Sequence, residues 1–335
     1  MGSIARSDAI AVPPDIFPKD LGRKAIPFFL LGIAAYVALF FFADARDTWK
    51  HIDHVSGARV FLCFALSFAS LLVRAVRWQF FVRLIGVTTP FADALLVFFV
   101  GIAMSVTPGK VGELVKSLLL KERWEVPAAR SAPLVVAERL TDVVAVLLLG
   151  GGGLLGVPGA ATAGAVTVLF AAGLLVLYVS QPAALFIVRQ LSRIPFVARR
   201  HDKLMAMHAS LEQASRPGPT AVAMALALLA WGLQSSCVWI IAGAFDGSGI
   251  SFAGGLVAYC APLLAGALAL LPGGLGATEA SMTGVLLALG GPGLTKSVAV
   301  AVTLLSRIVA FWFAVALGFA ALVTWRIRRK RAITV

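Results

Sequence analysis

The chain has 335 residues, of which 60% are hydrophobic and only 13% are charged, and its mean hydropathy is +0.93. A water-soluble domain covers its surface with charged side chains, typically about 25% of all residues. This composition therefore excludes a soluble globular protein and predicts an all-α, polytopic membrane protein. The net charge of +13 lies in segments between the apolar stretches, which argues against a nucleic-acid-binding protein.

A polar segment, residues 1–25, opens the chain, and the first apolar run follows at 26–43. This run is too long for the hydrophobic region of a signal peptide, and no small-residue cleavage motif follows it. We expect it to be a retained membrane span. Further apolar stretches come near or exceed the roughly 20 residues that a spanning helix needs. They are residues 60–78, 133–155, 162–179, 220–242 and 297–325.

Two other apolar stretches, 91–120 and 252–290, are each interrupted near the middle by a Pro-Gly pair. In the first, the limbs on either side of the interruption have 13 and 10 residues. At about 1.5 Å per residue neither limb crosses a hydrocarbon core of about 30 Å, so we predict a re-entrant helical hairpin. The second stretch has longer limbs and is compatible with a re-entrant hairpin or with two full crossings. Simple kinks in ordinary helices are the alternative for both.

The distribution of Lys and Arg predicts the orientation. With both termini in the cytoplasm, the inner segments hold 23 basic residues and the outer segments hold 4. Cytoplasmic loops are enriched in basic residues, so we expect a bacterial inner-membrane protein with cytoplasmic N- and C-termini. In this count Arg74, Arg77 and Lys116 mark the inner boundary. Two basic segments remain: a linker at 181–217, interpreted as a surface-lying amphipathic helix or a solvated loop, and a tail at 326–335.

The two interrupted stretches resemble each other in detail. Each has a Pro-Gly, then a further glycine, then a glutamate, which is Glu113 in the first and Glu279 in the second. A later span carries Arg139, 26 residues after Glu113, or Arg307, 28 residues after Glu279. Under the predicted topology the two units are inverted repeats, and such repeats with broken helices typically enclose a transport site. We expect one transmembrane domain at 26–325, with repeats at about 60–155 and 220–325.

Ionisable side chains within a membrane are functional candidates by default. Arg139 can be partly neutralised by Asp142 and keep other donors for a ligand. Arg307 has no acidic residue in its own span, so its partner is Glu279 or a bound anion. A guanidinium donates two hydrogen bonds to a phosphate at once, so two arginines suggest a lipid phosphate group. The glutamates are interpreted as partners of the arginines or as proton carriers.

The glycines of the two turns would allow a ligand to approach the backbone and its free N–H groups. Lys110 is a further candidate, whereas Lys116 is interpreted as a boundary residue. The candidate substrate-binding residues are therefore Arg139, Arg307, Glu113, Glu279, Glu138, Asp142, Lys110, Pro108, Gly109, Gly112, Pro272, Gly273, Gly274 and Gly276.

These motifs resemble the lysylphosphatidylglycerol synthase transmembrane (flippase-like) family, which also forms the membrane domain of the multiple peptide resistance factor. The resemblance covers about residues 25–326 and implies a lipid translocase with re-entrant hairpins around a central cavity. It rests on Arg74-Ala75-Val76-Arg77-Trp78, Thr107-Pro108-Gly109 with Gly112-Glu113, Glu138-Arg139 with Asp142, and Leu271-Pro272-Gly273-Gly274 with Gly276 and Glu279.

We therefore expect a lipid translocase that moves a polar-headgroup lipid between leaflets by alternating access. Its partners would be membrane lipids, with no nucleic acid, cofactor or metal. The sequence shows no nucleophile elbow, phosphate-binding loop or metalloprotease motif, and no aminoacyltransferase domain, so we expect no enzymatic activity. The main alternative is a proton-coupled transporter of a small soluble anion. A third hypothesis is a membrane subunit that anchors a lipid-modifying enzyme.

Overall fold

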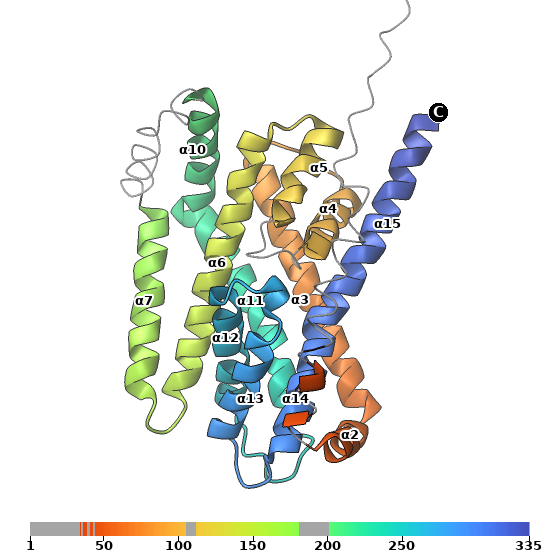
Figure 1. Ribbon diagram of the computed structural model, residues 1–335. Helices are drawn as coiled ribbons and strands as arrows, with labels where there is room; N and C mark the ends of the chain where they lie inside the picture. The colour runs from red at the N-terminus through yellow and green to blue at the C-terminus, as the bar shows by residue number, and fades with distance from the viewer. Residues whose placement is uncertain are drawn as a thin grey trace, which may run out of the picture.

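The computed structural model describes residues 34, 36–38, 41–42, 44–104, 112–180 and 201–334 (Figure 1). These residues form helices and no strand, as the composition predicts. The helices are α2 (Ala45–His54), α3 (Gly57–Leu84), α4 (Phe91–Ala103), α5 (Val115–Trp124), α6 (Ala128–Leu155), α7 (Ala161–Val179), α10 (His201–Ser215), α11 (Pro217–Ala242), α12 (Phe252–Leu268), α13 (Ala277–Leu289), α14 (Lys296–Arg307) and α15 (Phe313–Thr334).

Four of the described helices are long and apolar enough to cross a membrane: α3, α7, α11 and the rod Lys296–Arg329 that joins α14 to α15. Each contains one of the predicted spans. A π-helical turn, Ile308–Trp312, interrupts the rod directly after α14. The predicted span 133–155 lies in α6, which has 28 residues but carries several charges. Most of the predicted span 26–43 lies outside the described residues.

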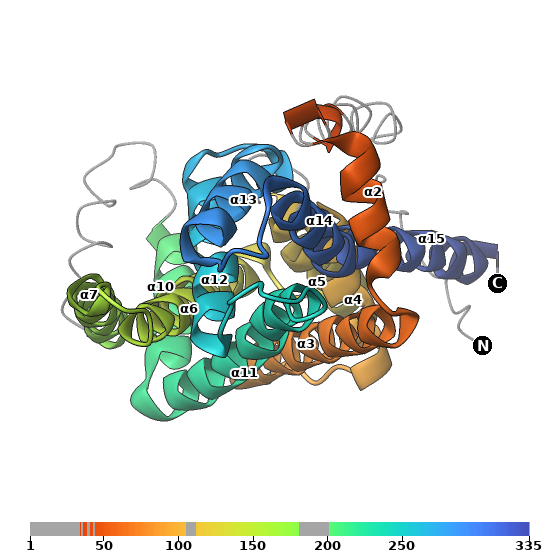
Figure 2. The same cartoon turned by 90° about the horizontal axis from the view of Figure 1, so that it is seen from below.

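The first spans of the two predicted repeats, α3 and α11, lie side by side between α7 at one edge of the molecule and α15 at the other (Figure 2). Polar side chains join them. Ser70 Oγ donates to the carbonyl oxygen of Ala230 at 2.8 Å, and Gln234 Nε2 donates to Ser67 Oγ at 2.8 Å. In a membrane, helices associate mainly through close packing of small side chains and through interhelical hydrogen bonds.

The two interrupted stretches form two pairs of short helices at opposite ends of the molecule: α4 and α5 in the upper half of Figure 1, α12 and α13 in the lower half. The helices have 13, 10, 17 and 13 residues, respectively. At about 1.5 Å per residue even the longest extends only about 26 Å. Each pair contributes to a separate buried apolar core, one around Phe98 and Leu119 and one around Met282 and Leu286.

The turn between α12 and α13 has the backbone that its glycines predict. Pro272 begins a short 3₁₀ turn, and Gly273, Gly274 and Gly276 have φ angles of 62°, 67° and 85°. Such angles strain any residue with a Cβ, so glycine is required here. The corresponding first turn, with Pro108, Gly109 and Lys110, lies outside the described residues.

Two features outside the repeats are also visible. In the linker, residues 201–215 form α10, which packs against α6, while residues 181–200 are not described. At the opposite end, Asp44 caps α2. The pKa of Asp44 is lowered because its carboxylate accepts hydrogen bonds from the backbone N–H groups of Asp47 and Arg46.

Candidate functional site: a charged cavity between two helical hairpins

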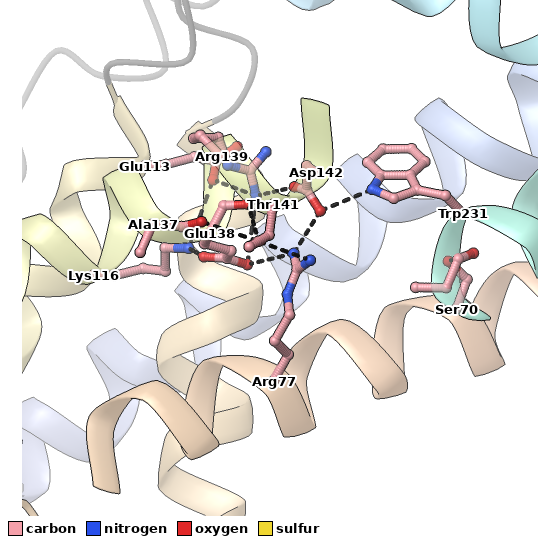
Figure 3. Close-up of polar contacts among 11 residues, drawn as sticks. Ser70, Arg77, Glu113, Lys116, Ala137, Glu138, Arg139, Thr141, Asp142 and Trp231 are labelled. Atoms are coloured by element: carbon pink, nitrogen blue, oxygen red, sulfur yellow. Dashed lines mark hydrogen bonds and ion pairs between the residues drawn. The ribbon is translucent and has the colours of Figure 1, made fainter. Parts of the chain in front are cut away.

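Asp142 of α6 is the centre of a buried group of charges (Figure 3). Its Oδ1 accepts hydrogen bonds from Arg77 Nη2 of α3 at 2.5 Å and from Trp231 Nε1 of α11 at 2.8 Å. Its Oδ2 lies 2.9 Å from Arg139 Nη2, one turn away on α6, as the spacing predicts. Asp142 therefore links α3 and α11, the first spans of the two predicted repeats, to α6, the arginine-bearing span of the first repeat.

Lys116 lies inside the same group. Its side chain is 1% exposed, and its ammonium pairs closely with Glu138 and lies 3.6 Å from Glu113. Gly101 of α4 makes room for the methylene stem, because a Cβ there would lie 2.6 Å from Lys116 Cγ. The Trp78 ring lies 4.5 Å from the ammonium and adds a cation–π contact. The interpretation of Lys116 as a boundary residue is therefore wrong.

Arg139 is surrounded by carboxylates. Besides Asp142, its Nη2 lies 3.3 Å from Glu113 Oε2 and 3.4 Å from Glu138 Oε1. Arg77 lies 3.6 Å from Glu138 and is fully buried. We refer to these six residues, Arg77, Glu113, Lys116, Glu138, Arg139 and Asp142, as the α6 cluster.

Arg77 corrects a second expectation. The charge count treats it as a residue of the inner boundary, yet its side chain is 0% exposed and bound to Asp142. Arg74, also counted there, lies in α3 and lines a cavity that is described below. Their spacing of three residues places both on one face of α3, and this spacing was the sequence signal that could have identified them as residues of the site. Charge counting assigned them to topology because they lie near the end of an apolar run.

The second hairpin carries a smaller version of the same arrangement. Arg307 Nε donates to Glu279 Oε1 at 2.7 Å, and its Nη2 donates to the carbonyl oxygen of Gly273 at 3.0 Å. Glu279 Oε2 accepts from the backbone N–H of Gly276 at 2.7 Å. The guanidinium stacks 4.5 Å from the Phe311 ring, which belongs to the π-helical turn. Of the two partners considered for Arg307, the structure shows Glu279.

The two hairpins therefore repeat one contact. In each, the glutamate that follows the Pro-Gly turn pairs with the arginine of the next span: Glu113 with Arg139 at 3.3 Å, and Glu279 with Arg307 at 2.7 Å. The matching sequence separations predicted this correspondence. If the two Pro-Gly pairs were only kinks in unrelated helices, there would be no reason for this contact to occur in both.

Glu113, Arg139 and Arg307 of these two pairs line one cavity of about 310 Å³. The charged and polar residues that line it, with two glycines, are Arg74, Glu113, Arg139, Asp142, Trp231, Gln234, Tyr259, Thr278, Arg307, Gly273 and Gly274. The apolar residues that line it include Leu71, Ile102, Val143, Val146, Leu263, Leu264, Leu270, Leu271, Ala310, Phe311, Ala314 and Val315. The cavity thus brings together helices from both predicted repeats.

Several predicted residues do not line this cavity. Glu138 and Glu279 lie behind it and hold its arginines. Gly112 lies in the short 3₁₀ turn that ends at residue 114, and Pro272 starts the second turn. Gly276 borders a different, apolar groove on the other side of α13. Among the described residues, no group of three or more His, Cys, Asp or Glu side chains is arranged to hold a metal ion.

The basic side chains of the site outnumber its carboxylates. Within the described ranges, the α6 cluster, the Glu279–Arg307 pair and Arg74 contribute five basic side chains and four carboxylates. The site has a surplus of one positive charge. A buried surplus of this kind is costly unless a ligand of opposite charge compensates it.

Comparisons with known proteins match most of the chain to one family of membrane proteins. The sequence model of a family described as the lysylphosphatidylglycerol synthase TM region matches residues 29–318. A protein described as UPF0104 membrane protein PH1989, from Pyrococcus horikoshii, is 23% identical over 320 residues, which cover 86% of this chain and 93% of that protein. A UPF0104 membrane protein of Methanothermobacter thermautotrophicus is 34% identical over 93 residues, covering 28% of this chain and 27% of that protein.

Proposed function

The chain belongs to the family of the lysylphosphatidylglycerol synthase TM region, and from this premise we propose that it is a lipid translocase. It moves a lipid with a polar, phosphate-bearing headgroup between the two leaflets by alternating access. The headgroup occupies the cavity between the hairpins while the acyl chains stay in the bilayer. No catalytic step is involved.

The observation that carries this proposal is the mixed lining of the cavity. Arginines from both repeats, Arg139 and Arg307, line it together with many aliphatic side chains. Leu270 is one of these aliphatic residues and is 65% exposed, and the neighbouring Leu268 is 84% exposed. A small soluble anion has no apolar part to contact these side chains, whereas a lipid has both a charged headgroup and apolar chains.

The short helices support a re-entrant arrangement. None of α4, α5, α12 and α13 is long enough to cross a core of about 30 Å. In this proposal the first hairpin enters from the cytoplasmic side and the second from the opposite side. Both turns then reach the middle of the membrane, where interrupted helices are tolerated if they line a cavity. The distribution of basic residues supports cytoplasmic termini, and the proposed location is a bacterial inner membrane.

Inverted repeats supply a mechanism. Two similar halves that meet at one site have two arrangements of similar energy, one open to each leaflet. The hairpin glutamates hold the arginines in place in the present arrangement. A phosphate entering the cavity competes with these carboxylates for guanidinium donors, and this exchange couples headgroup binding to movement of the hairpins.

The test is translocation of a fluorescent phospholipid in proteoliposomes, read by chemical bleaching of the outer-leaflet label. The protein should make inner-leaflet label accessible. Arg139→Lys and Arg307→Lys keep the charge but lose the planar fork, and should slow translocation at least about tenfold. Arg83→Lys is the matched control, because Arg83 lies on α3 with an exposed side chain.

Two results would contradict the proposal. If both lysine variants translocate lipid at the normal rate, the arginines do not bind the headgroup. If the protein moves no phospholipid but accumulates radiolabelled glycerol phosphate in sealed vesicles in response to a pH gradient, it is a proton-coupled carrier of a soluble anion.

A further inference from the structure

Arg74 differs from every other arginine that borders the cavity. Arg139 lies near three carboxylates, and Arg307 is bound by Glu279 and by a backbone carbonyl. In the described ranges, by contrast, Arg74 forms no ion pair with a carboxylate. Its Nε, like that of Arg139, is buried without a hydrogen-bond partner. Arg74 nevertheless lines the cavity.

Aromatic rings hold the Arg74 side chain in place. Its guanidinium carbon lies 4.9 Å from the Trp231 ring and 5.9 Å from the Phe98 ring. The Trp231 ring is itself fixed by its hydrogen bond to Asp142. Stacking on an aromatic face orients a guanidinium while leaving its in-plane N–H donors free for another acceptor.

Asp142 of the α6 cluster, which lines the same cavity as Arg74, is already occupied. Its Oδ1 accepts from Arg77 and Trp231, and its Oδ2 faces Arg139. Arg74 precedes Arg77 by three residues, which places it about 4.5 Å further along α3, away from the end that carries Arg83. The surplus positive charge of the site is therefore assigned to Arg74.

We propose that Arg74 binds the anionic oxygen of the ligand's phosphate, and that its surplus charge selects ligands with one net negative charge. This inference rests on the proposed function for the assignment of the ligand as a lipid, because a free phosphate ester has the same anionic oxygens. Arg139 and Arg307 contribute guanidinium donors, as proposed above, but their charges are paired with carboxylates, so Arg74 provides the net charge that the ligand neutralises. An anionic headgroup compensates this charge, whereas a zwitterionic headgroup brings its own cation into a site that is already positive.

Binding by the purified full-length protein tests this inference without requiring transport. The probes are dioctanoyl phosphatidylglycerol, dioctanoyl phosphatidylcholine and glycerol phosphate, titrated calorimetrically into protein in a neutral detergent. We expect phosphatidylglycerol to bind at least about tenfold more tightly than phosphatidylcholine, the factor expected for one charge-assisted hydrogen bond. Arg74→Gln should abolish this preference, and Arg74→Lys should keep part of it.

Arg83→Gln is the control, because it removes the same charge from the exposed part of the same helix. It should leave the preference unchanged. A purely structural role of Arg74, bracing α3 against Trp231, would lower thermal stability in Arg74→Gln without changing the ratio of the two lipid affinities. An unchanged ratio in that variant overturns the inference, as does equal or absent binding of the two lipids by the unmodified protein.

The third probe separates this inference from the proposed function. If glycerol phosphate binds as tightly as phosphatidylglycerol, and Arg74→Gln abolishes both, Arg74 is the anion site of a carrier for soluble phosphate esters, and the lipid proposal fails. If phospholipid is translocated in proteoliposomes but no affinity depends on Arg74, the translocase proposal stands and the inference fails.

Discussion

Replacing Asp142 by Asn tests whether the α6 cluster is held together by mutual charge compensation. The substitution preserves size and an acceptor for Trp231, but it removes the negative charge that faces Arg77 at 2.5 Å and Arg139 at 2.9 Å. Removing one partner of a buried ion pair costs about 3–5 kcal/mol, because the other charge stays buried without compensation.

The structure favours the lower end of this range. Arg77 retains Glu138 at 3.6 Å, and Arg139 retains Glu113 at 3.3 Å. We therefore expect a loss of about 3 kcal/mol in the free energy of unfolding. With roughly 2 °C per kcal/mol for a large chain, the midpoint of thermal unfolding in detergent should fall by about 6 °C, measured by tryptophan fluorescence.

Asp93→Asn provides the matched control. Asp93 lies 3.3 Å from both Arg123 and Arg328, but these side chains are 44% and 50% exposed. Solvent screens such pairs, so this variant should lose less than about 1 kcal/mol. The reasoning is refuted if Asp142→Asn destabilises no more than Asp93→Asn. It also fails if combining Asp142→Asn with Arg77→Met is additive, because removing the stranded cation should recover part of the loss.

Three further substitutions have distinct expected outcomes. Gly273→Ala should lower the free energy of unfolding by at least about 1–2 kcal/mol and slow lipid translocation, because φ is 62° and the new Cβ would lie 2.4 Å from Phe311 Cζ. Gly284→Ala is the control: its Cβ meets no atom within 4 Å, so it should leave both measurements unchanged. Glu279→Gln should lower the free energy of unfolding by about 3–5 kcal/mol, since Arg307 loses its anionic partner. A neutral result in denaturant titration would contradict this reasoning. Gly101→Ala should displace the stem of Lys116 and lower thermal stability by several degrees, and an unchanged midpoint in the same detergent would show that the helices adjust freely.

Much of the architecture follows from the sequence because the relevant information is local. Runs of apolar residues predict α3, α7, α11 and the rod Lys296–Arg329, since a helix must be apolar over its whole length to lie in lipid. The matched Pro-Gly and glutamate motifs predict two similar hairpins. For Arg307 the sequence narrows the partner to Glu279 or a bound anion, because its own span has no acidic residue, and the structure shows the pair with Glu279.

The composition of the α6 cluster was decided by tertiary packing. Arg77 meets Asp142 across 65 residues of sequence, and Lys116 meets Glu138 across 22. Periodicity reports which residues share a face of one helix, but it does not report which faces of different helices meet. Residues that charge counting assigned to the membrane boundary are therefore buried in the site. Only the packing of α3 against α6 and α11 distinguishes Arg77, which pairs with Asp142, from Arg74, which lines the cavity and forms no ion pair among the described residues.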